Sequence, residues 1–483
     1  MDFKKSKVFL IRLMVAYWVF ALMIYAVSFQ QFKYTDATGE APAAATVIGE
    51  FTDGHEIRQT LLAPLGTLRG VSVMTATYGR KNEGEMAVAL EDADGNRLTE
   101  FSVPLADFND GEYTEILFPE PIDGYETQAL TLCLSTRGSG EGNAATMYFG
   151  TTYAGSQMLS APVDPSNYFQ IDGNPGQGML CARLNSRYER RFYKTYWVIV
   201  TGVFALAALL CAIWWRQARR GKNNPLVVLC TLKTRYALLF NQLVSRDFKT
   251  KYKRSMLGML WSFLNPLLTM AVQYVVFSTL FRSNIKNYPV YLLTGIVFFN
   301  FFNEAVTLGM TSITSNASLI KKVYMPKYIY PISRVASSMI NFLLALVPLL
   351  LVMLITGTGL HFSLLLLVFD VACLLGFITG MSLLLTTCMT FFQDTQFLWG
   401  VVSMIWMYLT PIFYPETIIP AKLISIYRLN PLYQFITFAR TCIISGISPQ
   451  PEMYLGCIVS ACAALLLGAA VFKKCQDRFI LYL

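Results

Sequence analysis

Charged residues and metal-binding residues are both scarce in this chain. Only 14% of its 483 residues are Asp, Glu, Lys or Arg and 54% are hydrophobic, which excludes an ordinary soluble protein and predicts an integral membrane protein. There are two histidines, and none of the ten cysteines follows CxxC spacing, so we expect no metal site. A phosphate loop of the form GxxxxGKS or GxxxxGKT is also absent, which excludes ATP hydrolysis by that route.

Long apolar runs are abundant instead. A helix needs about 20 apolar residues, at about 1.5 Å of rise each, to cross a hydrocarbon core of about 30 Å. The first run is not followed by a small-residue cleavage motif, so we interpret it as a retained anchor and not as a removed signal peptide. Eight runs are candidate spans: residues 8–28, 195–215, 257–281, 290–311, 332–356, 362–389, 397–412 and 453–472.

Clusters of lysine and arginine predict how these spans are oriented. With eight spans and both termini cytoplasmic, residues 34–186 lie outside a bacterial cytoplasmic (inner) membrane that the chain crosses several times. Four basic clusters then fall on the cytoplasmic side, at residues 4–7, 216–222, 321–327 and 473–478. A fifth cluster disagrees, and snorkelling to outer headgroups could explain it. It consists of Arg187, Arg190, Arg191 and Lys194.

Residues 34–186 lack a helical period. Short alternating runs separated by turn residues predict strands, and strands of this length and spacing favour a jelly-roll-like β-sandwich. The segment Asp92–Asn96 resembles part of a calcium loop but lacks the later bidentate glutamate, so a hairpin turn is the preferred interpretation. The predicted strands are residues 68–78, 84–90, 97–103, 112–118, 129–135 and 145–149.

This outer segment is also acidic. It holds 7 Lys or Arg against 21 Asp or Glu, a net charge of −14. This charge disfavours binding of a strongly anionic polymer, and we expect no nucleic acid as a partner. Its two cysteines, Cys133 and Cys181, are equally compatible with a disulfide and with two thiols. Tyrosines could stack on sugar rings, fill the sandwich core, or belong to a module that only covers an exit. The candidates for glycan binding are Tyr78, Tyr113, Tyr125 and Tyr148.

A basic amphipathic segment leads into the third apolar run. Apolar side chains at residues 238–248 can occupy one face of a helix in the membrane interface and cations the other. The cations could recruit the diphosphate of a lipid-linked glycan, or bind anionic membrane lipids at about 1 kcal/mol each. They are Arg246, Lys249, Lys251, Lys253 and Arg254.

Four motifs occur in order over the last 240 residues. They are RDFKTKYKRSMLGMLWSFLNPL, GIVFFNFFNEAVTLGMTSITSNASLIKKVYMPKYIYPIS, FFQDTQF and TPIFYPETIIPAKLISIYRLNPLYQFITFAR. In this order they resemble the permease subunit of type-2 ABC exporters that move O-antigen, teichoic acid or capsule-like polysaccharides. The resemblance implies a six-helix core and a homodimer with two ATP-binding subunits, which carry the ATP and Mg. It implies no cofactor in this chain and a lipid-linked glycan as substrate.

The resemblance also implies site residues. A cytoplasmic coupling loop at 312–330 would contact the ATPase, and an outer re-entrant segment at 411–440 would form the exit gate. Coupling residues would be Asn316, Leu319, Ile320, Lys321, Lys322, Tyr324 and Pro326. Aromatic residues could line the substrate channel or pack against lipid and neighbouring helices. They are Phe298, Phe299, Phe302, Trp399, Trp406, Tyr408, Phe413 and Tyr414.

Charged residues inside spans tend to face protein interiors, and Glu304 is the candidate interior polar contact. The whole chain therefore predicts a membrane α-helical protein with an inserted outer β-domain. The expected parts are an anchor at 1–33, the β-sandwich at 34–186, a second membrane helix at 187–222, an interface helix at 223–256 and the permease core at 257–483.

The preferred function is the channel-forming membrane subunit of an ATP-driven polysaccharide exporter, with the outer domain guiding or binding the glycan. It is a transporter subunit and not an enzyme. Two alternatives stay open: a type-2 ABC exporter of a smaller lipid or drug, and a non-ABC glycan scaffold or chain-length regulator. A membrane glycosyltransferase is disfavoured, because the only DxD arrangement considered, Asp92 with Asp94, falls in a predicted outer hairpin.

Overall fold

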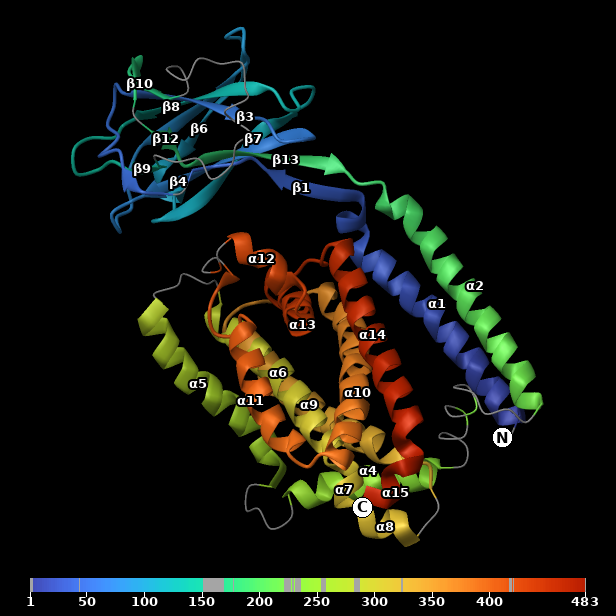
Figure 1. Cartoon of the computed structure of the whole chain (residues 1–483). Coiled ribbons are helices and arrows are strands. Elements are labelled where there is room, and N and C mark those ends of the chain that lie inside the picture. The colour runs from blue at the N-terminus through green and yellow to red at the C-terminus, as the bar shows by residue number, and fades with distance from the viewer. Residues whose placement is uncertain are drawn as a thin grey trace. The chain divides into compact units, whose positions relative to one another are not determined.

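The computed structural model describes residues 3–42, 44–150, 169–176, 178–220, 227, 230, 236–252, 258–281, 287–322, 325–416, 419 and 421–482. The chain forms two compact units (Figure 1). One is a helical unit made of Met1–Gln31 and Phe192–Leu483, and the other is a β unit, Phe32–Arg191. The β unit is slightly wider at each end than the predicted 34–186.

The β unit contains two antiparallel sheets. The seven-stranded sheet has the order β1-β13-β4-β9-β12, with β7 paired to β4 and β2 paired to β9. Its strands are β1 Tyr34–Thr38, β2 Thr46–Val47, β4 Thr67–Ala76, β7 Glu112–Ile122, β9 Thr146–Gly150, β12 Met179–Leu180 and β13 Ala182–Glu189. The six-stranded sheet has the order β11-β10-β3-β8-β5-β6. Its strands are β3 Glu56–Leu62, β5 Glu85–Glu91, β6 Arg97–Pro104, β8 Ala129–Arg137, β10 Phe169–Ile171 and β11 Asn174–Pro175.

The two sheets share one hydrophobic core, so the β unit is a sandwich. Val71 and Val73 of β4 and Leu132 and Leu134 of β8 are each 0% exposed, because alternate residues of a strand point to the same side. Gly70 allows β7 to bulge against β4, since a Cβ there would lie 2.3 Å from a backbone oxygen. All six predicted strands are present, and the prediction of a strand-rich domain is confirmed.

The turn between β5 and β6 confirms the hairpin interpretation of residues 92–96. The two strands pair directly, from Glu85 with Pro104 to Glu91 with Arg97. Asp92 accepts the backbone N–H of Asp94 at 2.9 Å and that of Asn96 at 2.8 Å. The Asp92 carboxylate therefore stabilises the turn itself.

The basic cluster that disagreed with the predicted orientation has a partly different explanation from snorkelling. Arg187 belongs to β13 and pairs with Asp36 of β1, with 2.5 Å between Nε and Oδ1. Its charge is matched inside the β unit. The strand β13 runs as far as Glu189, so the sandwich extends beyond the predicted end at residue 186.

The helical unit contains a helix at each of the eight predicted spans. They are α1 Phe3–Lys33, α2 Phe192–Arg219, α5 Trp261–Phe281, α6 Tyr288–Met310, α9 Ile329–Ile355, α10 Leu367–Phe391, α11 Thr395–Leu409 and α14 Pro451–Cys475. Among the described residues, six helices are long and apolar enough to cross a membrane, and the apolar parts of α5 and α11 are shorter. Eight crossings stay a prediction. The shorter helices are α4 Ala237–Tyr252, α7 Ser312–Ser315, α8 Ala317–Lys322, α12 Ala421–Arg428, α13 Pro431–Arg440 and α15 Phe479–Tyr482.

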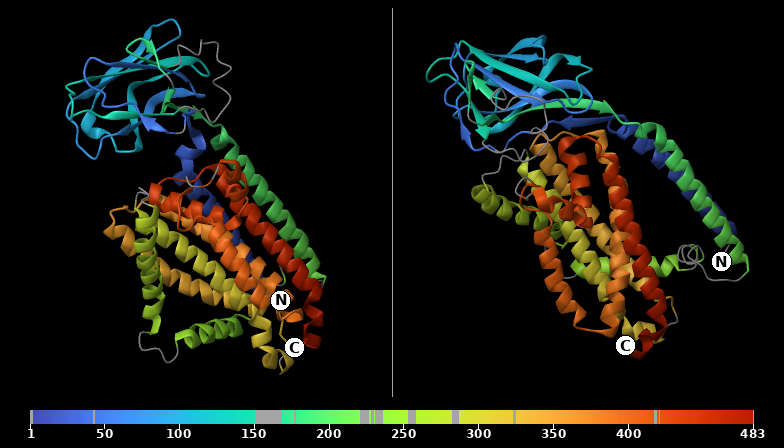
Figure 2. Two further views of the ribbon diagram at one scale, coloured as in Figure 1. Left: turned by 60° about the vertical axis from the view of Figure 1, so that its left-hand side comes forward. Right: turned by 45° about the horizontal axis from the view of Figure 1, so that its top comes forward.

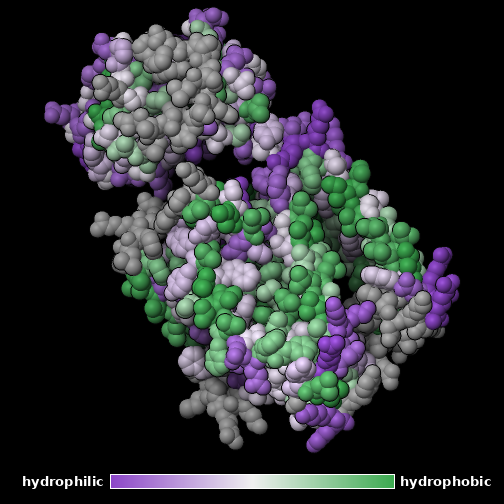
Figure 3. Space-filling model, in the orientation of Figure 1, coloured by the Kyte–Doolittle hydropathy of each residue, from purple (hydrophilic) through white to green (hydrophobic). Residues whose placement is uncertain are grey.

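Helices α6, α9, α10 and α14 run side by side in both views of Figure 2. The closest approach joins α10 and α14, where a Cβ on Gly468 would lie 2.0 Å from the carbonyl oxygen of Gly380. Small residues allow such contact where lipid gives helices no hydrophobic reason to associate. Hydrophobic side chains cover much of the visible surface of these helices in Figure 3, as a lipid-facing surface requires.

We predict that Cys133 and Cys181 are unreactive thiols in the folded chain. Both are free and buried, and burial raises the pKa of Cys133 to about 12 and that of Cys181 to about 11. At pH 8 nearly all of each thiol is protonated, and only the thiolate reacts quickly. Iodoacetamide should label neither cysteine in the purified native chain and both after denaturation without reductant, as read by peptide mass spectrometry. Absence of label after denaturation would reveal a disulfide instead.

Candidate functional site

A cavity of about 1010 Å³ opens among α4, α5, α6, α9 and the segment after α6. Polar side chains line it although α6 and α9 are membrane-length helices. Asn300, Asn303 and Glu304 follow the three- and four-residue spacing of one face of α6. Ser338 and Asn341 do the same on α9. Polar groups at membrane depth are costly and mark functional sites.

Glu304 is a polar residue of this cavity, as predicted for an interior contact. Its carboxylate accepts Lys251 Nζ of α4 at 2.8 Å on each oxygen. Asn341 Nδ2 of α9 donates to Oε1 at 2.7 Å. Glu304 therefore ties the interface helix to α6 and α9. Lys251 is therefore paired with this carboxylate. The predicted role of Lys251, binding a diphosphate or a lipid headgroup, did not include this ion pair.

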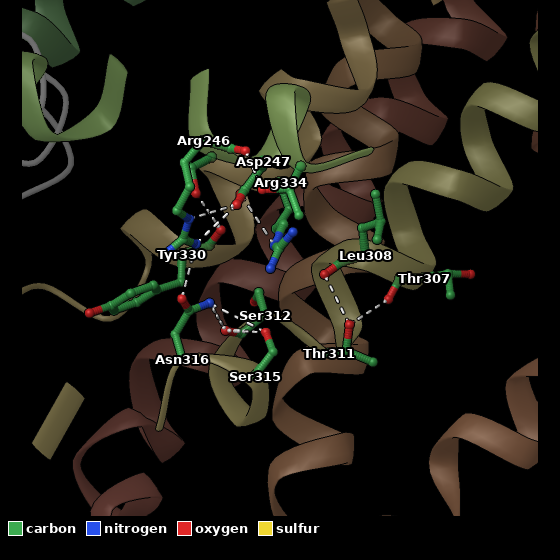
Figure 4. Close-up of polar contacts among 12 residues, drawn as sticks. Arg246, Asp247, Thr307, Leu308, Thr311, Ser312, Ser315, Asn316, Tyr330 and Arg334 are labelled. Carbon is green, nitrogen blue, oxygen red and sulfur yellow. Dashed lines mark hydrogen bonds and ion pairs between the residues drawn. The ribbon is translucent and has the colours of Figure 1, made fainter. Parts of the chain in front are cut away.

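A second ionic cluster also lines the cavity, and Figure 4 shows its polar contacts. Asp247, whose side chain is 6% exposed, pairs with Arg246 at 2.9 Å and with Arg334 of α9 at 3.3 Å. Arg246 Nη2 also donates to Asn316 Oδ1 at 3.1 Å. The cluster joins α4, α9 and the predicted coupling loop, so these three elements are mechanically linked.

The predicted coupling loop has a buried side and an exposed side. Asn316 and Ile320 are buried, and Ile320 and Leu319 pack on a core cluster that includes Leu243 of α4. Lys321 and Lys322 are exposed. Pro326 is half-buried, and Tyr324 lies outside the described residues. A rigidly held segment with two solvated cations is suited to contact another protein.

The other predicted headgroup-binding cations are dispersed. Lys249 is exposed on α4, whereas Lys253 and Arg254 lie outside the described residues. Arg246 and Lys251 are already paired with carboxylates. Of the described cations in this set, Lys249 is therefore the one best suited to a lipid headgroup.

Most of the predicted channel aromatics lie in the interior of one protomer. Phe298, Phe299, Phe302, Trp399 and Phe413 are between 0% and 5% exposed. Phe302 packs against Phe377, Trp399 and Trp406 with ring centroids 5.3 to 5.9 Å apart. Neighbouring aromatic side chains enclose these rings, so the rings act as packing in this conformation. Tyr408 is 59% exposed and Tyr414 half-buried, and channel lining by these two stays a prediction.

The predicted gate segment begins where α11 ends at Leu409. From Thr410 the backbone is irregular, so its carbonyls need other donors. Arg440 of α13 is buried and donates to the carbonyls of Pro411 at 2.6 Å and Ile412 at 3.0 Å. Tyr288 donates to Phe413 O at 2.6 Å and Tyr291 to Tyr414 O at 2.9 Å. These side chains replace the missing helical bonds.

Arg440 and the cavity amides of α5, α6 and α9 were not among the predicted site residues. Arg440 ends the apolar run FITFAR, where a charge signals an interior role. Asn300, Asn303, Glu304 and Thr307 give a polar face to an otherwise apolar span. Both signals are visible in the sequence, but neither identifies the partner.

The four tyrosines proposed for glycan binding do not form one surface. Tyr125 packs against the sandwich core, which favours the packing interpretation for this residue. Tyr113 lies under the guanidinium of Arg183, 4.2 Å from the ring centroid, on the seven-stranded sheet with Tyr148 of β9. Tyr78 is 50% exposed in the turn after β4, with a φ of 58°. All four keep part of their surface exposed, including Tyr125.

We predict that Asp247→Asn loosens the junction of α4, α9 and the coupling loop. Loss of the carboxylate leaves Arg246 and Arg334 facing each other, and the cost should be about 1–3 kcal/mol because both arginines are partly solvated. The Tm of the purified chain in detergent should fall. A double-mutant cycle with Arg334→Gln should give a non-zero coupling energy, and strict additivity of the two changes would contradict the pairing.

We predict that Arg440→Met destabilises the gate segment. Met keeps an unbranched apolar side chain but is shorter and donates no hydrogen bond, and each carbonyl left unpaired costs about 1–3 kcal/mol. The yield of folded chain and its Tm should fall, whereas Arg428→Met on the exposed face of α12 should change neither. Equal Tm values for the two variants would show that water or other donors satisfy these carbonyls.

Comparison with known proteins agrees with this architecture. Residues 238–444 match the family ABC-2 type transporter. An "O-antigen export system permease protein RfbA" of Klebsiella pneumoniae is 30% identical over 257 residues, which cover 98% of that protein and 52% of this chain. A protein of the same name from Myxococcus xanthus is 28% identical over 95% of its length and 50% of this chain. The "Polysialic acid transport protein KpsM" of Escherichia coli is 22% identical over 92% of its length and 49% of this chain.

The similarity covers nearly the whole length of each of these relatives and about half of this chain. It includes the helices that build the cavity, the coupling loop and the whole gate segment. The chain belongs to the ABC-2 type transporter family and is a multi-pass membrane permease.

Proposed function

We propose that this chain is the channel-forming membrane subunit of an ATP-driven exporter that moves a lipid-linked polysaccharide outward across the bacterial cytoplasmic membrane. The observation that carries the proposal is the match over 98% of the length of an O-antigen export permease. A polar cavity between membrane helices supports it, because a polysaccharide needs hydrogen-bonding groups along its path.

Two copies of the chain would form the transporter, with the conduit between them. Supporting this, α11 presents an apolar face that its own protomer leaves open, including Phe397 at 76% and Leu398 at 66% exposure. Val272 and Val275 of α5 are similarly exposed, at 65% and 64%. Lipid or the second protomer must cover these faces.

Separate ATP-binding subunits would supply the energy, with ATP and Mg bound there. The exposed Lys321 and Lys322 beside the buried Ile320 provide a contact surface for such a subunit. Movement of this surface would reach α4 and α9 through Asn316, Arg246 and Asp247. Both termini would then lie in the cytoplasm.

The β unit would lie outside and receive or guide the emerging glycan. The partly exposed rings of Tyr78, Tyr113 and Tyr148 support this role. The net charge of −14 on residues 34–186 favours a neutral polymer, because an anionic one would be repelled.

We predict that reversing the charge of the coupling loop separates the permease from its ATPase. Lys321→Glu with Lys322→Glu should abolish co-purification of the ATPase and surface display of the polysaccharide, without lowering the Tm, because both side chains are exposed. Lys473→Glu with Lys474→Glu, also exposed, is the matched control and should leave both unchanged.

Two outcomes would count against the proposal. Normal co-purification with the Lys321 and Lys322 variant would remove this loop as the ATPase contact. Normal surface polysaccharide in cells that lack the chain would remove the transport function altogether.

A further inference from the structure

The cavity among α4, α5, α6 and α9 has the chemistry of a binding site for an uncharged, hydroxyl-rich ligand. Asn265, Asn300 and Asn303 contribute side-chain amides and Ser338 a hydroxyl. An amide both donates and accepts, as a sugar hydroxyl does, so the two are complementary. The volume of about 1010 Å³ is at the top of the range of about 300–1000 Å³ usual for small-molecule sites.

Polar atoms of this cavity lack the partners that buried groups normally have. Asn303 Oδ1 and Ser338 Oγ are buried and form no hydrogen bond in the described part of the chain. Ser338 is only 1% exposed. More than nine in ten buried polar groups in proteins are paired, so two orphans lining one cavity indicate a ligand or water that completes them.

The charges of the cavity argue against a phosphate as that ligand. Lys251 is held by Glu304 at 2.8 Å, and Arg246 and Arg334 share Asp247. A phosphate would have to displace these carboxylates or lie beside them. An uncharged ligand meets no such competition.

One aromatic face is available next to the amides. Trp261 lines the cavity at the start of α5 and is 46% exposed. The rings of Phe301 and Phe342 stack on each other, with centroids 4.5 Å apart, and form part of the opposite wall. An exposed indole beside hydrogen-bonding groups offers the combination of an apolar surface and a few convergent polar groups that ligand sites use.

We propose that each protomer holds an uncharged saccharide segment of the exported polymer in this cavity, through Asn300, Asn303 and Ser338. The proposal rests on the function proposed above and adds a substrate site within the protomer. It assigns the sugar, and not the phosphate end of the lipid carrier, to these residues.

Photo-crosslinking in cells that make their own polymer tests the site directly. A benzoylphenylalanine placed at Asn300 should capture the polysaccharide and give a ladder of permease–glycan adducts that disappears when polymer synthesis is blocked. The same probe at Asn265, also exposed in the cavity, should give the same ladder. At Leu343, exposed on α9 but outside the cavity, it should give none. Adducts with phospholipid alone at both cavity positions would overturn the proposal.

A second measurement uses the intact exporter without a probe. Asn300→Leu and Ser338→Ala should each lower the rate of polymer export about three- to tenfold at equal permease abundance, which corresponds to one lost hydrogen bond. Leu343→Ala is the control and should export at the normal rate. Normal export by both cavity variants, in cells where deletion of the permease stops export, would refute the saccharide site while leaving the transport function intact.

Discussion

Polar groups buried at membrane depth must find partners inside the protein, and the helical unit is organised around this constraint. The clearest case is Arg440, which supplies donors to the carbonyls of Pro411 and Ile412 where α11 has ended. Without these bonds the chain could not leave the helical conformation at that depth. The guanidinium in turn is stabilised by the ring of Tyr291, 3.4 Å from its centre. The irregular backbone of the gate segment is therefore stabilised by hydrogen bonds from side chains of α6 and α13.

The same constraint is met differently at the other polar site. Around the cavity, carboxylates and cations from α4, α6 and α9 neutralise one another, which removes the cost of isolated charges but leaves amides and hydroxyls incompletely paired. The ion pairs fix the position of α4, while Asn303 Oδ1 and Ser338 Oγ stay open to a ligand. A structural role and a binding role are thus divided between neighbouring residues: Glu304 holds the helices together, and Asn300 faces the open space.

The sequence identified elements with a strong local signal and missed those defined by distant partners. Apolar runs of about 20 residues predicted every long helix, and alternation predicted six strands. Strands β2, β11 and β12 have two residues each, too few for a period, and β13 is obscured by buried Asn185 and Ser186 at a bulge.

Glu304 was predictable because a charge stands out in an apolar span. The pairing of Asp247 with Arg334 was not, because it joins residues 87 positions apart. Phe298 and Phe302 were predicted to line a channel, but composition alone cannot distinguish a lining ring from a packed one.

The charge patterns of the two units lead to the same conclusion about the polymer proposed as substrate. In the helical unit, a polyanion entering the cavity would have to displace Asp247 and Glu304 from their partners. In the β unit, it would meet the net charge of −14 that residues 34–186 carry. These obstacles lie in separate units and arise from unrelated residues, so neither follows from the other. An uncharged glycan meets neither of them, and it also supplies the hydroxyls that Asn303 and Ser338 lack as partners. The similarity to a polysialic acid transporter, at 22% identity, is therefore a weaker guide to the substrate than the arrangement of charges in this chain.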